Sequence, residues 1–74
     1  MSEVAAKILS ESIGKIVLIK LRGDKNLRGK LRSFDIHLNI VLDDAEEIKD
    51  DGTSRRLGTV VIRGENVVLI SPVS

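Results

Sequence analysis

The 74-residue sequence contains no cysteine, tryptophan, tyrosine or glutamine, and only one phenylalanine, one histidine and one proline. The absence of cysteine excludes disulfides and thiolate metal sites, which are common means of stabilising a small domain. A domain of this length buries a modest fraction of its surface, so association with further chains is the expected compensation. The longest apolar runs, residues 16–19 and 67–70, are far too short to span a membrane. We therefore expect a single domain, residues 1–74, in a soluble, cytoplasmic protein without a membrane partner.

Charge is strongly segregated along the chain, although the formal net charge is only +1. Residues 1–33 carry a net charge of +5, residues 34–54 a net charge of −6, and residues 55–74 a net charge of +2. Binding along a nucleic-acid duplex scales with the number of phosphates neutralised, and it favours a continuous basic surface. We therefore expect no DNA partner, and any nucleic-acid site should be local.

One helix and five strands are expected. Ser2 can cap a helix that runs to about Ser12, with an apolar side formed by Val4, Ile8 and Leu9. Beyond it, β-branched residues and spaced glycines predict strands at residues 16–22, 27–35, 39–48, 55–62 and 67–70. Gly29 indicates a bend inside the second strand, and Pro72 is expected to stop the fifth. The fold class is therefore mainly β, a short N-terminal helix followed by a strongly bent five-stranded antiparallel sheet or open barrel.

The last two expected strands are unusually apolar at residues 60–62 and 67–70. They carry few of the lysines or prolines that protect an exposed sheet edge. Pairing of the fourth strand of one copy with the fifth strand of another would be a head-to-tail contact. Such contacts close into rings when the rotation allows, so a homo-oligomeric ring is expected.

A candidate binding site lies where polar and apolar residues alternate, in residues 34–40. One strand over residues 30–45 would be too long, so we place a turn at residues 36–38. Asp35 and Asn39 then flank the turn, and His37 lies at its tip. An acid, an imidazole and a carboxamide at this spacing suit a flat ligand with hydrogen-bonding edges. A second tight turn is expected at residues 63–66.

Two segments resemble the paired motifs of a known family. Residues 17–47 resemble the first Sm motif through Gly29, Phe34, Asp35, His37, Asn39 and the run 44–47. Residues 58–72 resemble the second through Ile62, Arg63, Gly64, Glu65, Asn66 and Val67. The chain is thus similar to the archaeal Sm-like (LSm) proteins. This resemblance implies the SH3-like Sm fold, a homo-oligomeric ring usually of seven subunits, and U-rich single-stranded RNA bound near the pore. It implies RNA processing or ribonucleoprotein assembly, with no enzymatic activity and no cofactor.

The resemblance also assigns roles to individual residues. It implies that His37 and Arg63 stack on a uracil base, that Asn39 reads the base edge, and that Asp35 supports Asn39. It further implies that Gly64 lets the backbone approach, while Glu65 stands where aspartate is common. The side chains themselves agree with these roles, because imidazole and guanidinium groups offer planar faces and a carboxamide can match the donor and acceptor of uracil.

Other interpretations remain open at this point. His37 could be a solvated turn residue, Arg63 could pair with Glu65, and Asp35 could cap the turn. The acidic residues Asp43, Asp44, Glu46 and Glu47 could bind a divalent metal, but alternation along a strand favours a solvated acidic surface. A ring that serves mainly as a protein-interaction scaffold is the alternative function. A metal-dependent nuclease is a third hypothesis.

Overall fold

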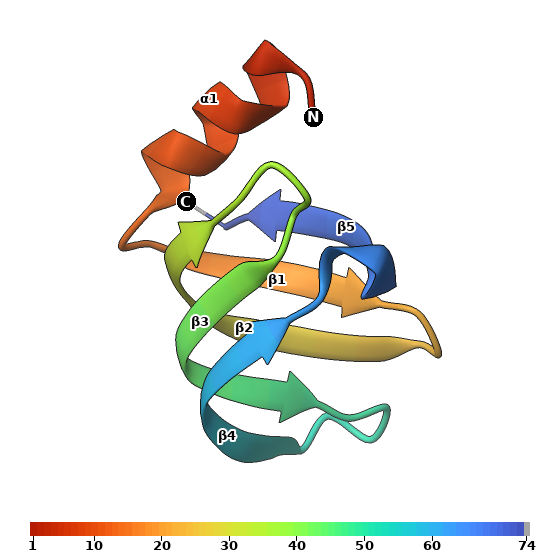
Figure 1. Cartoon of the computed structure of the whole chain (residues 1–74). Coiled ribbons are helices and arrows are strands. Elements are labelled where there is room, and N and C mark those ends of the chain that lie inside the picture. The colour runs from red at the N-terminus through yellow and green to blue at the C-terminus, as the bar shows by residue number, and fades with distance from the viewer. Residues whose placement is uncertain (74) are drawn as a thin grey trace.

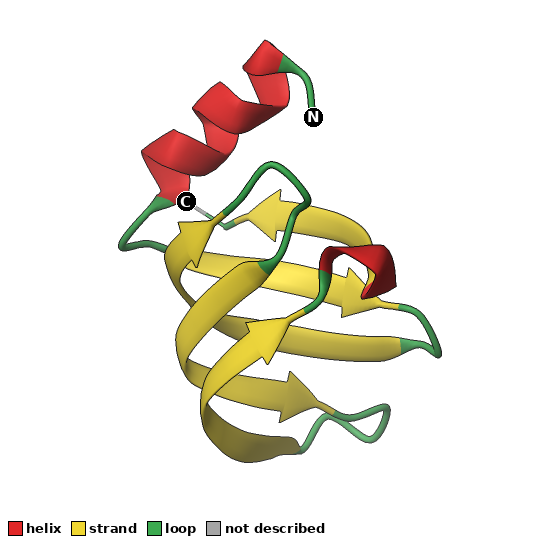
Figure 2. Ribbon diagram, viewed as in Figure 1, coloured by secondary structure: helices red, strands yellow, loops and turns green. Residues whose placement is uncertain are grey.

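A helix precedes five strands in the computed structural model, which describes residues 1–73 (Figure 1). The elements are α1 (Glu3–Ser12), β1 (Ile16–Leu21), β2 (Lys25–Phe34), β3 (Ile40–Ile48), β4 (Ser54–Ile62), the 3₁₀ turn η1 (Gly64–Asn66) and β5 (Val67–Pro72). Neighbouring strands run antiparallel, and the sheet is strongly bent (Figure 2). The predicted fold class is confirmed. No helix within residues 1–73 is long and apolar enough to cross a membrane.

The helix begins and ends as the sequence predicts. The Ser2 hydroxyl oxygen accepts a hydrogen bond from the Ala5 N–H at 3.1 Å, which satisfies one of the free donors of the first turn. On the expected apolar side only Leu9 is buried, whereas Val4 is 69% exposed and Ile8 48% exposed in the single chain. The helix lies at the end of the sheet where the β2–β3 loop is found (Figure 1).

The strand order β4-β3-β2-β1-β5 makes β4 and β5 the two edges of the sheet. The most exposed apolar residue on β4 is Val61, at 72%, while Val68 and Leu69 on β5 are 57% and 50% exposed. The prediction that Pro72 stops the fifth strand at Ile70 is wrong, because Pro72 pairs with Val17 as the last residue of β5. An edge strand tolerates proline at its end, since within the single chain no further strand needs the missing N–H.

Gly29 marks the bend, as predicted. A Cβ atom at this position would lie 3.1 Å from the Ala45 Cα and 3.1 Å from the Leu42 Cβ. The pairing register of β2 with β3 shifts between Arg28 and Lys30, which spans Gly29, and that of β3 with β4 shifts after Leu42. The bent sheet encloses a core whose largest fully buried side chains are Val17, Ile19, Leu31, Ile40 and Leu42.

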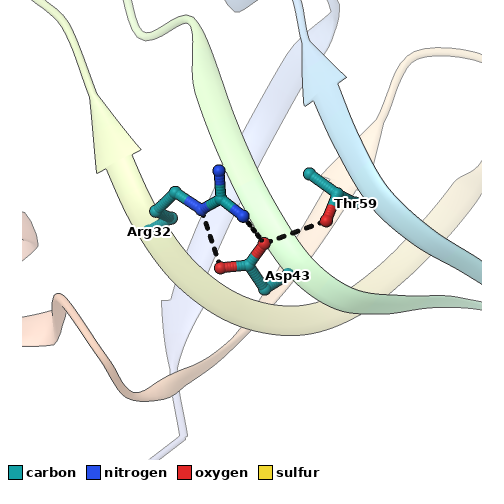
Figure 3. A network of polar contacts seen from close by, with 3 residues as sticks. All are labelled: Arg32, Asp43 and Thr59. Atoms are coloured by element: carbon teal, nitrogen blue, oxygen red, sulfur yellow. Dashed lines mark hydrogen bonds and ion pairs between the residues drawn. The ribbon is translucent and has the colours of Figure 1, made fainter.

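Acidic and basic side chains pair across neighbouring strands, and Figure 3 shows one such group. The Arg32 Nε donates to Asp43 Oδ2 at 2.8 Å, and the Thr59 hydroxyl donates to Asp43 Oδ1 at 3.0 Å, so the three residues join β2, β3 and β4. Arg28 of β2 forms an ion pair with Glu46 of β3. The Arg32 guanidinium, with help from Thr59, holds the pKa of Asp43 below its usual value. Asp43 and Glu46 thus remain partly exposed on the surface, where each pairs with an arginine of β2.

Candidate nucleic-acid interface

The candidate site forms where two distant loops touch. One loop, residues 35–39, joins β2 to β3, and the other contains η1 between β4 and β5. The Gly64 N–H donates to the side-chain oxygen of Asn39 at 2.8 Å. A Cβ atom at Gly64 would lie 1.8 Å from the backbone oxygen of His37, which is far inside van der Waals contact. Only glycine permits this approach.

Asp35 organises the first loop. One oxygen of its carboxylate accepts hydrogen bonds from the backbone N–H groups of His37, at 2.9 Å, and Asn39, at 3.0 Å. The other oxygen accepts from the Asn39 side-chain amide at 3.0 Å. These bonds, with the Asn39 side chain first, hold the pKa of Asp35 below its usual value. Asp35 therefore does both things predicted for it, since it caps the turn and it supports Asn39.

The amide of Asn39 has a fixed orientation. Its oxygen faces the Gly64 N–H and its nitrogen faces the Asp35 carboxylate. Rotating the amide by 180° would place its N–H donors against the Gly64 N–H, and its oxygen against the carboxylate oxygen of Asp35. A carboxamide has two lone pairs and two N–H groups, and each internal bond uses one of them. Asn39, which is half-buried, thus retains one acceptor and one donor for a ligand.

The two loops border a depression of about 430 Å³. It is lined by His37, Asn39, Arg63, Gly64 and Glu65. Five of the six residues predicted for the site are thus brought together, and the sixth, Asp35, lies behind Asn39. His37 is exposed at its turn, and Arg63 Nη2 lies 3.2 Å from Glu65 Oε1, as the alternative interpretation of Arg63 anticipated.

Two further residues contribute to the site, and sequence reasoning missed one of them, Arg22. Leu38 has a positive φ of 59°, and its half-buried side chain packs against the hydrophobic core. Arg22, in the β1–β2 turn, donates its backbone N–H to the Asn66 oxygen at 2.9 Å and so braces η1. The alternation of residues 34–40 hinted that Leu38 points inward. No local pattern could place Arg22 beside η1, because that contact depends on β5 lying next to β1.

A helix, a bent five-stranded sheet with two apolar edges, and a polar depression between two loops define a small open β-barrel of the SH3-like class. The family model of the LSM domain matches residues 7–72 of the chain. The chain therefore belongs to the Sm-like family.

Proteins of several archaea are similar to this chain. The snRNP Sm-like protein of Methanococcoides burtonii is 48% identical over 65 residues, which cover 88% of this chain and 90% of that protein. The P. aerophilum SmAP1 heptamer has a subunit that is 53% identical, with a TM-score of 0.93 over 100% of this chain and 99% of that chain. The Pyrococcus abyssi Sm protein, solved in complex with a uridine heptamer, is 46% identical, with a TM-score of 0.84 over 90% of this chain and 94% of that chain.

Proposed function

We propose that the protein forms a homo-oligomeric ring, a heptamer, that binds U-rich single-stranded RNA near the pore, with one base in the depression of each subunit. The observation that carries this proposal is the fixed amide of Asn39, which offers one donor and one acceptor between His37 and Arg63. Support also comes from the P. aerophilum heptamer and from the uridine heptamer bound to the P. abyssi protein. The role is binding rather than catalysis, in RNA processing or ribonucleoprotein assembly in the cytoplasm.

The amide orientation favours uracil over cytosine. Uracil presents an N–H donor beside a carbonyl acceptor, which match the free oxygen lone pair and the free N–H of Asn39. Cytosine presents an acceptor beside an amino donor, so it would require the reversed amide. Reversal would break the bonds to both Asp35 and Gly64. The flat faces of His37 and Arg63 add stacking, which contributes about 1 to 3 kcal/mol per base.

The edges of the sheet supply the ring contacts. β4 of one copy would pair with β5 of the next, which covers Val61 on one side and Val68 on the other. The contact is head-to-tail, and it closes when the rotation between neighbours allows. A ring repeats the depression once per subunit, so sites of modest affinity bind one oligonucleotide tightly by effective concentration.

Affinity for oligo-U tests the proposal directly. His37→Ala and Arg63→Ala should each weaken oligo-U binding by about tenfold or more, because each removes one stacking surface. Light scattering on the same samples should give an unchanged ring mass. Unchanged affinity in both variants would exclude the site. Oligo-C or oligo-A bound as tightly as oligo-U would favour the protein-scaffold alternative, and RNA cleavage on addition of magnesium or manganese would contradict a non-enzymatic role.

A further inference from the structure

Arg63, one of the two side chains proposed to stack on the base, already has an anionic partner within the depression. Its Nη2 lies 3.2 Å from Glu65 Oε1, and both side chains line the depression while remaining largely exposed, at 77% and 62%. We propose that Glu65 is a specificity-determining residue, which neutralises Arg63 so that the guanidinium receives a base and does not capture a phosphate. The inference rests on the proposed function, because it concerns which part of an RNA the same site selects.

The charge balance at the depression supports this assignment. Arg63 supplies one positive charge, while Glu65 and Asp35 supply two negative charges, so the net local charge is −1 when His37 is neutral. The hydrogen bonds that Asp35 accepts keep its carboxylate ionised. Phosphate binding scales with the number of positive charges available to neutralise it. The depression is therefore poorly suited to phosphate and well suited to a neutral base.

The geometry lets Arg63 hold Glu65 and a base at once. A guanidinium is planar and donates its hydrogen bonds in the plane, so an ion pair at its edge leaves the flat face available for stacking. The side chains of Arg63 and Glu65 also extend from the same short turn. That turn is fixed by the Asn66 N–H bond to the Arg63 oxygen, at 3.0 Å, and by the Gly64 N–H bond to Asn39, at 2.8 Å.

Salt dependence separates this role from a merely structural one. An arginine that neutralises a phosphate releases a counterion, and each such contact steepens the slope of log affinity against log salt by about 0.7 for single strands. An arginine already neutralised by glutamate contributes much less to that slope. Removing the charge of Glu65 should therefore steepen the slope by up to about 0.7 per engaged subunit.

The experiment compares the wild-type ring with Glu65→Gln and Glu65→Asp, using a uridine heptamer and an adenosine heptamer over a series of salt concentrations. Glu65→Gln should steepen the salt slope and should lower the U-to-A affinity ratio at low salt by about fivefold, the factor for one unit charge at about 4 Å in water. Glu65→Asp keeps the charge, so it should retain the wild-type slope and ratio.

A wild-type slope and ratio in Glu65→Gln would overturn the inference, and so would a Glu65→Asp variant that behaves like Glu65→Gln. Failure of the proposed function is seen separately, as a wild-type ring that does not prefer uridine or as unchanged affinity in both His37→Ala and Arg63→Ala. Because the Glu65 side chain is largely exposed, all the variants should keep the wild-type fold and ring mass.

Discussion

The side-chain oxygen of Asn39 accepts a hydrogen bond from the backbone N–H of Gly64 at 2.8 Å, across 25 residues of sequence. This one bond joins the β2–β3 loop to the turn between β4 and β5. It also fixes the orientation of the amide that would read the base. The site therefore exists only when the two loops are held at their native separation, so a change in either loop should alter recognition by the other.

Gly64→Ala should abolish the site. The added methyl group would lie 1.8 Å from the His37 oxygen, so the loops must separate and the bond to Asn39 must break. We expect oligo-U affinity to fall by more than about tenfold. The hydrogen bonds from Asn39 to the base edge would be lost, and His37 and Arg63 would no longer be placed to stack on the base. Fluorescence anisotropy with labelled oligo-U measures this change.

Gly52→Ala is the matched control. Gly52 has a positive φ of 87°, but a Cβ atom there would meet nothing within 4 Å. The substitution should lower the free energy of unfolding by about 1 to 2 kcal/mol through the left-handed backbone alone. Its oligo-U affinity should remain that of the wild type. An equal loss of affinity in both variants would mean that general destabilisation, and not the loop contact, explains the effect of Gly64→Ala.

Much of the site was predictable because its signals are local. The limit on strand length places Asp35 and Asn39 on either side of a turn, and the structure has that turn. Other features depend on sheet order and register, which no local pattern contains. The contact of Arg32 with Asp43 lies where the register of β2 with β3 is irregular, between Leu31 and Ser33. The bond from Arg22 to Asn66 requires β5 to lie beside β1.

Asp35→Asn should weaken the preference for uracil. The new amide would place a donor against the Asn39 amide nitrogen, where the carboxylate now accepts. We expect the U-to-C affinity ratio to fall by about tenfold, the scale of one lost charge-assisted hydrogen bond. The lowered pKa of Asp35 means that this carboxylate stays ionised to a lower pH than an ordinary aspartate does. Competition binding between oligo-U and oligo-C at neutral pH, where both bases are uncharged, measures this ratio. A full wild-type preference in Asp35→Asn would contradict the orienting role.

Val61→Lys and Val68→Lys should each break the ring. These valines lie on opposite edges of the sheet and are 72% and 57% exposed in the single chain. A lysine on an edge strand opposes pairing with a further strand, because its charge would have to be desolvated in the contact. Light scattering should then report monomers or small open assemblies, and affinity for long oligo-U should fall with the loss of multivalency.

Ile16→Lys is the control for the edge variants. Ile16 is 44% exposed, but it lies on β1, which has a neighbouring strand on both sides. Its ring mass should match that of the wild type. Intact rings in both edge variants would show that the subunits associate through some other surface.

Asp43→Asn should lower thermal stability in a pH-dependent way. Asp43 bridges three strands through Arg32 and Thr59, and these partners lower its pKa in the folded state (Figure 3). A carboxyl group with a lower pKa in the folded state stabilises the fold at every pH above its unfolded value. That stabilisation is lost as the pH falls through the lowered folded value. The wild type should therefore exceed Asp43→Asn in Tm by a few degrees at neutral pH, and the difference should begin to shrink near the unfolded pKa of about 3.9 and disappear only below the lowered folded pKa. Asp44→Asn provides the comparison at the same bend, since Asp44 is exposed and forms no side-chain hydrogen bond within residues 1–73. Thermal unfolding followed by circular dichroism from pH 7 downward measures all three proteins, and an equal loss of Tm in the two variants would remove the specific role of the bridge across β2, β3 and β4.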